Sequence, residues 1–397
     1  MKMNIFHNEH MFTFPKPYPV KPFSPLSEEN YSETMDMVVL PILAHCREDD
    51  WTSVEGEFVD LKGITSALPS PVGIHSVYYN HHDFAHYLEK IKIHRGYRGI
   101  TPNSLPLQRP CQDIIDSSAM SRGTIFISIG FSESEIKFEE LAWYFLQYGF
   151  DIVIIEHRGH GYSAREISQP SIVSIASWKT YESDFLAVMQ HIRSQYDIPR
   201  PFYLYGHSMG GGIGAALLED YPFLFQGAVL SAPMIAPRVS LPVTLLRYAT
   251  ECITLLGFGK KVIKDKNHPT NDGQNHSAWS QIRLQWYHSH RLADPHLHLE
   301  NPNYQWAREA LRMNHYIMKW KNISHIKTPT LVFQAGDDIW VSNHAQNAFV
   351  QKARCMHAPL RFYHIGTARH EIFNDTPTIM AKYLRSVMSF YLSDDII

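Results

Sequence analysis

The chain has few cysteines, no long apolar run and little net charge. Four cysteines occur in 397 residues, at Cys46, Cys111, Cys252 and Cys355, and no two have the spacing of a metal-binding or redox pair. Scattered single cysteines predict free thiols in a reducing compartment. No segment approaches the roughly 18 consecutive apolar residues of a membrane span, and the N-terminal residues lack the apolar core of a signal peptide. These absences predict a cytoplasmic protein without a transmembrane helix.

The charge balance excludes a further class of protein. The formal net charge is -3, with 19% charged and 44% hydrophobic residues, which is an ordinary globular composition. A nucleic-acid-binding protein would carry a basic surplus. We therefore expect no nucleic-acid partner, and the length suits either one large catalytic unit or two to three domains.

From Thr124 onward, short apolar runs alternate with segments of helical periodicity. The runs are typical of strands that are buried on both faces. Alternation of this kind predicts a mostly parallel central sheet that is covered by helices and joined by right-handed crossovers. The predicted strands cover 124–130, 151–157, 202–208, 227–233, 328–336 and 360–366, and the predicted helices 138–149, 178–196, 210–222, 343–354 and 377–392.

An interruption of this alternation predicts an inserted helical cap. The segments are an N-terminal accessory region (1–120) that leads into the first strands, the first part of the core (121–236), the cap insertion (237–322) and the second part of the core (323–397).

The accessory region carries weaker signals of its own. Residues 32–46 read as a helix and 55–63 as a strand, and 74–80 could pair with 90–97 as two strands.

Ser208 is the candidate nucleophile, in the sequence Gly206-His207-Ser208-Met209-Gly210. It lies between a buried strand and a helix rich in small residues, as a nucleophile elbow requires. Gly206 and Gly210 remove the side chains that would collide with the neighbouring strand and helix. The alternative is a glycine-rich turn that happens to contain a serine.

A serine hydroxyl needs a base, and the base needs an orienting acid. Asp337 and Asp338 directly follow the strand at 328–336, and His370 follows the strand at 360–366. Because the carboxyl ends of parallel strands share one edge of a sheet, we expect these loops to meet at Ser208. With 24 histidines in the chain, His370 could instead be a surface histidine.

An oxyanion hole needs two backbone donors near the nucleophile. The N–H of Met209, at the start of the helix after Ser208, is one candidate. The turn at Gly130-Phe131, after the first buried strand, would provide the other. The segment 156–163 reads as a tight turn that supports the site structurally.

Several segments together resemble the lysophospholipase and monoacylglycerol-lipase branch of the α/β-hydrolases, most of all bacterial lysophospholipases of the PldB type. They are residues 129–165, 203–222, 280–290 and 301–309, and the sequence around His370, and the similarity covers roughly residues 120–395. The resemblance implies an α/β-hydrolase fold with a cap. It also implies Ser208 as nucleophile, Asp338 as acid and His370 as base.

The resemblance likewise implies that Phe131 and Met209 provide the oxyanion-hole N–H groups. The chain departs from many relatives at Ile129-Gly130, where those relatives have His-Gly, and in its longer N-terminal region. The expected function is hydrolysis of the carboxylic ester of a lysophospholipid or monoacylglycerol through an acyl-enzyme. No cofactor and no metal are expected.

Two other functions stay open. A serine aminopeptidase that releases N-terminal proline shares the fold and the elbow, and it would need an acidic cap residue such as Glu300 or Glu309 for the substrate's amino group. A non-catalytic binding protein on the same scaffold would be expected to lack a triad member, but here every position is filled.

The remaining patterns have two interpretations each. The apolar segment 241–261 is either a cap helix packed on the core or a lid that receives an acyl chain or contacts the inner face of a membrane. The pairs His82/His86 and His296/His298 have metal-ligand spacing but no convincing third ligand. The sequence does not determine the oligomeric state.

Overall fold

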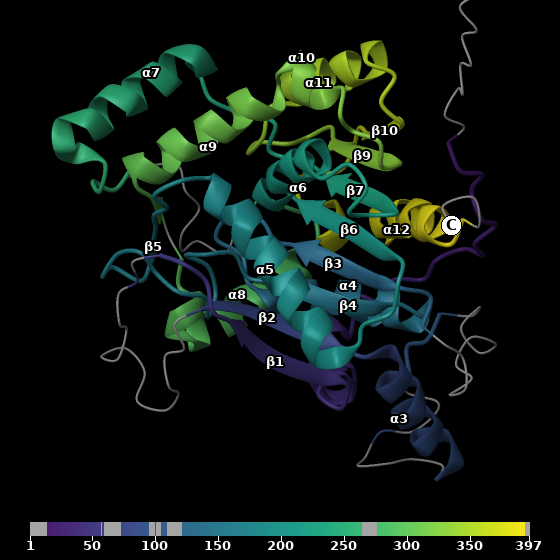
Figure 1. Cartoon of the computed structure of the whole chain (residues 1–397). Coiled ribbons are helices and arrows are strands. Elements are labelled where there is room, and N and C mark those ends of the chain that lie inside the picture. Colours follow the sequence, from purple (N-terminus) through teal and green to yellow (C-terminus); the bar gives the residue numbers. More distant parts are fainter. Residues whose placement is uncertain are drawn as a thin grey trace, which may run out of the picture.

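The computed structural model describes residues 14–56, 58, 73–94, 100, 105–108, 121–263, 276–299 and 301–393. Eight of the described strands form one sheet in the order β1-β2-β4-β3-β6-β7-β9-β10 (Figure 1). The strands from β4 to β10 are parallel to one another. At one edge β2 pairs antiparallel with β4, and β1 pairs antiparallel with β2. Their bounds are β1 Arg47–Thr52, β2 Ile74–Tyr79, β3 Thr124–Ser128, β4 Asp151–Ile155, β6 Phe202–His207, β7 Gly227–Ser231, β9 Thr330–Ala335 and β10 Leu360–Ile365. The predicted mostly parallel sheet is confirmed.

Helices cover both faces of the sheet (Figure 1). Apolar side chains of α4 (Glu139–Gln147) and α12 (Pro377–Tyr391) pack against one face. Those of α5 (Lys179–Tyr196), α6 (Met209–Asp220) and α11 (Asn343–Cys355) pack against the other. Because side chains alternate along a strand, Ile125 and Ile127 of β3 face the first layer and Phe126 the second. Burial on both faces explains why these strands are continuous apolar runs.

The N-terminal region adds helices and two strands to this framework. The predicted helix at 32–46 is present as α1 (Tyr31–Thr34), η1 (Met35–Val39) and α2 (Leu40–Leu43).

Two predictions for this region fail. The strand after α2 is β1, which comes earlier than the predicted strand at 55–63; there Glu55, Gly56 and Phe58 are not in a strand, and the other positions lie outside the described residues. The predicted pairing of 74–80 with 90–97 is wrong, because 90–93 belong to helix α3 (His81–Ile93). Asn80 caps this helix by accepting a hydrogen bond from the Asp83 N–H at 3.0 Å, so the chain turns into a helix after β2.

Between β7 and β9, no described strand joins the main sheet. The helices α7 (Val243–Ile253) and α9 (Tyr304–Ile317) lie side by side (Figure 1), and α9 also contacts α6. In contrast, α8 (Gln281–Ala293) packs against α1. Shorter elements complete this part: η5 (Thr254–Phe258), η6 (Pro295–Leu297), α10 (Trp320–Ile323) and β8 (Asn301–Pro302), which pairs with β5 (Ile172–Val173).

None of the described helices is long and apolar enough to cross a membrane.

Candidate active site

Ser208 lies at a sharp turn between β6 and α6. Its backbone has φ +52° and ψ -117°, a conformation that non-glycine residues rarely adopt and that marks stored strain. The two elbow glycines are needed because the backbone is crowded here. A Cβ atom on Gly206 would lie 2.7 Å from the Gly210 carbonyl oxygen, and one on Gly210 would lie 2.0 Å from the Ser128 carbonyl oxygen. The turn therefore presents the Ser208 hydroxyl at the carboxyl edge of the sheet.

The structure brings Ser208, His370 and Asp338 into one hydrogen-bonded chain. The distance from His370 Nε2 to Ser208 Oγ is 2.8 Å, and that from His370 Nδ1 to Asp338 Oδ2 is 2.7 Å. Since the carboxylate can only accept, Nδ1 carries the proton and Nε2 is free to accept from the hydroxyl. All three residues are buried. This is the arrangement by which an imidazole can remove the proton of a serine.

The neighbouring Asp337 takes no part in this chain. Its side chain is 53% exposed and lies 3.6 Å from the Arg369 guanidinium. Asp338 points inward instead, and its Oδ1 accepts the N–H groups of Trp340 at 2.8 Å and Val341 at 3.0 Å. Of the two candidates for the acid, only Asp338 contacts His370.

The two partners of Ser208 stabilise each other's charged forms. Burial would lower the pKa of the His370 imidazole, but the charge and hydrogen bond of Asp338 raise that pKa above its ordinary value. Burial would raise the pKa of the Asp338 carboxyl, but His370 and two backbone N–H groups hold it below its ordinary value. Asp338 is therefore ionised at neutral pH, and His370 becomes protonated at a higher pH than a free histidine.

One predicted oxyanion donor, Met209, begins the helix that follows Ser208, and the other, Phe131, lies in the loop after β3. Met209 is the first residue of α6, and the first N–H groups of a helix have no partner within it. The N–H of Phe131 has no hydrogen-bond partner among the described residues. The Phe131 ring packs against Trp306 of α9, with ring centroids 4.3 Å apart. Ile129, at the start of this loop, is buried in the core, so its side chain acts in packing.

The segment 156–163 forms the tight turn that the sequence predicts. The buried carboxylate of Glu156 accepts the N–H groups of Glu135 at 3.1 Å and Tyr162 at 2.6 Å, and it lies 2.8 Å from His75 Nδ1. Gly161 has φ +47°, and a Cβ there would lie 1.9 Å from the same carboxylate. These contacts indicate a structural role for the turn.

Three buried charged residues beside the site were not predicted from the sequence. They are Glu133 in the loop after β3, Lys137 in the following 3-10 turn, and Glu371 next to His370. The only signal for them was the i,i+4 spacing of Glu133 and Lys137, which usually indicates an exposed helical pair.

Among the described residues, the histidine pairs form no metal site and the cysteines form no disulfide. His82 and His86 lie on α3 with ring centroids 6.4 Å apart, and His296 Nδ1 lies 3.0 Å from Asp294. Over the described ranges, no group of three or more His, Cys, Asp or Glu side chains could hold a metal ion. Cys46, Cys252 and Cys355 are free, and Cys111 lies outside the described residues.

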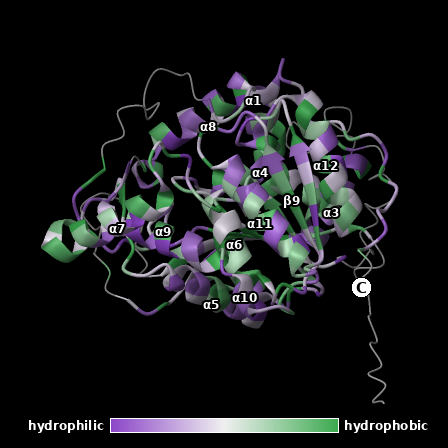
Figure 2. Cartoon of the chain, turned by 90° about the horizontal axis from the view of Figure 1, so that it is seen from above, coloured by the Kyte–Doolittle hydropathy of each residue, from purple (hydrophilic) through white to green (hydrophobic). Residues whose placement is uncertain are grey.

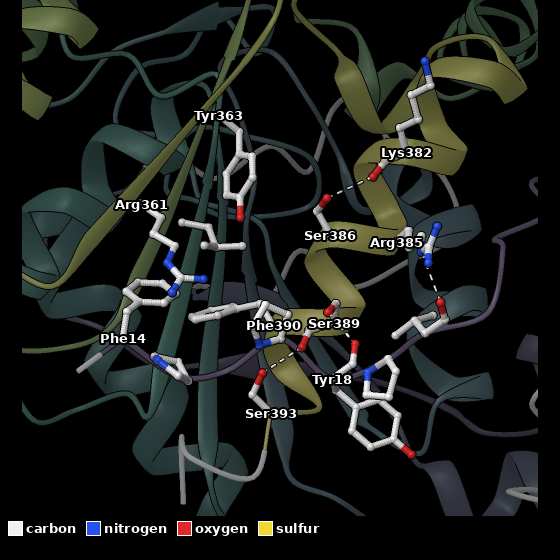
Figure 3. Close-up of a pocket in the computed structure, with 15 residues that line it drawn as sticks. Phe14, Tyr18, Arg361, Tyr363, Lys382, Arg385, Ser386, Ser389, Phe390 and Ser393 are labelled. Carbon is white, nitrogen blue, oxygen red and sulfur yellow. Dashed lines mark hydrogen bonds between the residues drawn. The ribbon is translucent and has the colours of Figure 1, made fainter.

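A groove of about 510 Å³ lies apart from the triad, between the N-terminal arm (14–20), β10 and α12 (Figure 3). There the Arg361 guanidinium stacks on the Phe14 ring at 4.0 Å. The groove is lined by Leu331 and Arg361, near the starts of β9 and β10, whereas Asp338 and His370 follow the ends of these strands. None of the predicted site residues lines this groove. The active site is therefore assigned from the hydrogen bonds of Ser208, His370 and Asp338, and not from the position of the groove.

Comparisons with known proteins agree with this geometry. Residues 119–377 match the family model described as "Serine aminopeptidase, S33". Lysophospholipase L2 of Escherichia coli (strain K12) is 26% identical over 276 residues, which cover 67% of this chain and 79% of that protein. Human monoglyceride lipase is 31% identical over 139 residues, which cover 34% of this chain and 43% of that protein.

A solved structure supports the fold. The thermostable carboxyl esterase of Bacillus coagulans superposes with a TM-score of 0.61 at 15% identity, over 89% of this chain and 99% of that one.

Proposed function

Since the chain belongs to the serine aminopeptidase S33 family, in the lysophospholipase and monoacylglycerol lipase branch of the α/β-hydrolases, we propose that it hydrolyses the ester of a lysophospholipid or monoacylglycerol. The coarser statement, that the protein is a hydrolase of the esterase and lipase class, follows from the family and its relatives. The hydrogen-bonded chain Ser208–His370–Asp338, with distances of 2.8 and 2.7 Å, carries the proposed mechanism, and the similarity to lysophospholipase L2 and monoglyceride lipase supports the lipid substrate.

The proposed reaction has two acyl-transfer steps. As Ser208 Oγ attacks the ester carbonyl carbon, His370 Nε2 takes its proton, and the N–H groups of Phe131 and Met209 stabilise the oxyanion. His370 then gives the proton to the leaving oxygen of glycerol or of a glycerophosphodiester as the ester bond breaks, and the acyl group stays on Ser208. In the second step His370 removes a proton from water as the water oxygen attacks the acyl carbon. The bond between this carbon and Ser208 Oγ then breaks, His370 returns the proton to Oγ, and the fatty acid is released. Asp338 stays ionised throughout and stabilises the protonated imidazole.

The family description keeps an aminopeptidase as the second candidate. Such an enzyme would need a free carboxylate for the substrate's amino group. Glu309 is buried and occupied: its Oε1 accepts from Arg308 and Arg312 at 2.9 Å each, and its Oε2 accepts the Trp178 N–H at 3.1 Å. Glu300, the other candidate, lies outside the described residues. The occupied state of Glu309 favours the ester substrates.

A substrate panel tests the proposed function. We expect kcat/KM for 1-monoacylglycerol or lysophosphatidylcholine to exceed that for a proline amide by at least about 10³-fold, because a site without an acceptor for a charged amine leaves that amine unpaired on binding. Ser208→Ala, assayed in parallel, identifies hydrolysis by contaminants. A preference for the proline amide would establish the aminopeptidase instead.

We also propose that residues 237–322 cap the active site and that the outer end of the cap contacts a lipid surface. Leu255 and Leu256, in η5, are 76% and 72% exposed. Figure 2 shows this end of α7 as a green, hydrophobic ribbon at the edge of the molecule. The exposed large apolar residues between 237 and 263 are Val239, Leu241, Leu245, Tyr248, Leu255, Leu256 and Phe258. Arg247, Lys260 and Lys261 flank them with positive charge, which suits an anionic membrane. The cytoplasmic location stays a prediction.

Removal of the two leucines is expected to weaken vesicle binding. Burial of one leucine is worth about 1.5–3 kcal/mol, so Leu255→Ser/Leu256→Ser should lower the partition coefficient by roughly 10²-fold. This partition coefficient is measured by sedimentation of the protein with phosphatidylcholine vesicles that contain phosphatidylglycerol. Phe223→Ser is the matched control, because Phe223 is 85% exposed but lies between α6 and β7. Equal partitioning of parent and double variant would refute the membrane contact.

A further inference from the structure

Three buried charged side chains connect the loop that carries Phe131 to the loop that carries His370. We call residues 129–134 the oxyanion loop and residues 366–371 the histidine loop. Lys137 Nζ donates to Glu133 Oε1 at 3.0 Å and to Glu371 Oε1 at 2.8 Å. The exposed fractions of the side chains are 5% for Glu133, 7% for Lys137 and 3% for Glu371. One ammonium group thus joins two loops that are more than 200 residues apart in the sequence.

Glu133 holds the backbone of its own loop. Its Oε2 accepts the N–H of Gly130 at 2.5 Å, and the turn that returns Glu133 to this position places Ser132 at φ +57°. The carboxylate fills the space above Gly130, since a Cβ there would lie 2.6 Å from Glu133 Oε2 and 3.1 Å from Ser208 Cβ. The hydrogen bond therefore fixes the peptide immediately before the one whose N–H belongs to Phe131.

The same carboxylate also lies beside the elbow. Glu133 Oε1 is 3.4 Å from His207 Nε2, and the other ring nitrogen of His207 lies 3.2 Å from the Ser231 carbonyl oxygen. On the far side, Glu371 Oε2 accepts from Asn374 Nδ2 at 2.9 Å. Glu133 thus touches the oxyanion loop and the residue before Ser208, while its partner Lys137 reaches the residue after His370.

Glu133 and Lys137 stabilise each other's charged forms. Burial would raise the pKa of Glu133, but Lys137 and His207 hold it well below its ordinary value. Burial would lower the pKa of Lys137, but Glu133 and Glu371 raise it well above its ordinary value. Both groups are charged at neutral pH, so their hydrogen bonds are charge-assisted and directional. Buried ion pairs add little net stability, because desolvation offsets their attraction, and a role in fixing geometry fits them better.

We propose that Glu133 and Lys137 are positioning residues, which hold the oxyanion loop at a fixed distance from His370 so that the Phe131 N–H and the imidazole act on the same carbonyl group. The proposal rests on the proposed serine hydrolase mechanism. In this chain the carboxylate of Glu133 holds the loop, and Ile129 at its start is buried in the core.

Two variants that change charge in opposite directions test the proposal. Glu133→Gln keeps an acceptor for Gly130 but loses its charge, and Lys137→Met keeps the length of the side chain but removes the link. Both are expected to lower the pH-independent kcat for p-nitrophenyl butyrate by roughly 10–100-fold with KM within about threefold, because a misplaced oxyanion donor weakens only the transition state. The affinity for an alkylboronic acid, which mimics the oxyanion on Ser208, should fall in parallel.

A purely electrostatic role gives a different result. Glu133 raises the pKa of His370, so Glu133→Gln would move the acid limb of kcat/KM to lower pH and Lys137→Met to higher pH, while the pH-independent kcat would not change. That outcome would overturn the positioning role. So would a kcat within about twofold of the parent in both variants.

Glu140→Gln is the matched control for loss of a buried ion pair. Glu140 on α4 accepts from Arg283 Nε and Nη2 at 2.9 Å each, away from both loops. We expect this control to lower the unfolding temperature and leave kcat within about twofold of the parent. If Lys137→Met does not fold, Lys137→Arg replaces it, because a guanidinium is larger than an ammonium and directs its donors differently, which would change the distance between the two carboxylates. An equal kcat loss in Glu140→Gln would overturn the proposal. A parent without esterase activity would refute the proposed function itself.

Discussion

Ser208→Ala is expected to lower kcat for ester hydrolysis by roughly 10⁴–10⁶-fold with little change in KM. The hydroxyl supplies the oxygen that forms the acyl-enzyme, and no other described serine hydroxyl is hydrogen-bonded to His370. What activity remains would come from the oxyanion hole and from substrate binding. The measurement is steady-state hydrolysis of p-nitrophenyl butyrate and of 1-monoacylglycerol.

Ser194→Ala is the control for this substitution. Ser194 lies exposed on α5 and donates only to the His191 carbonyl oxygen at 2.7 Å, so this variant should match the parent. Thermal unfolding of all three proteins verifies that Ser208→Ala is folded. Hydrolysis by a folded Ser208→Ala at the rate of the parent would show that another group is the nucleophile.

Asp338→Asn is expected to lower kcat by roughly 10⁴-fold. An amide can present its NH₂ group to His370 Nδ1, which favours the tautomer that has its proton on Nε2 and cannot accept from Ser208. The loss of the negative charge also destabilises the protonated imidazole in the transition state. Asp337→Asn is the matched control, because Asp337 is one residue away and half-exposed; it should remain within about threefold of the parent.

The pH dependence of the same two proteins gives an independent readout. Catalysis needs a neutral His370, so kcat/KM falls as the pH decreases through the pKa of this group. Because Asp338 raises that pKa, the acid limb of the parent should have its midpoint above about 6.5, the value of an unperturbed histidine. Asp337→Asn should keep this midpoint, whereas Asp338→Asn should move it to lower pH. If Asp337→Asn were the variant that lost activity, the acid would be misassigned.

The core of the fold was predictable because its strands are buried on both faces. Runs such as 124–130 and 151–157 have no plausible position except inside a covered sheet. β1 was missed for the opposite reason: its sequence, Arg-Glu-Asp-Asp-Trp-Thr, lies at the sheet edge, partly exposed, and has no apolar run. The segment 90–97 alternates in polarity like a strand. However, a helix begins after the cap at Asn80 and continues to Ile93, so residues 90–93 belong to α3.

The triad was predictable because chain order and strand ends determine where its members meet. The choice between Asp337 and Asp338 came from the family resemblance, and the structure explains it by the direction of each side chain. Glu133, Lys137 and Glu371 were not predictable. Their contact depends on two loops that are distant in the sequence, and charged residues at such spacing are usually exposed.

The inserted segment was only partly predictable. Its apolar stretch at 241–261 allowed two interpretations, a packed cap helix and an exposed lid. In the structure, α7 packs on α9 while Leu255 and Leu256 remain exposed. The helix α8 contacts α1, and its buried Arg283 pairs with Glu140 of α4; local sequence cannot indicate either contact.

Covalent labelling with a fluorophosphonate that carries one long alkyl chain tests the central claim most directly. We expect one label per molecule, on the peptide that contains Ser208, with complete loss of activity and protection by monoacylglycerol. The long-chain probe should react at least about tenfold faster than a short-chain one, because the acyl site would bury its additional methylene groups. A label on another residue, no label on active enzyme, or equal rates for the two probes would contradict the account.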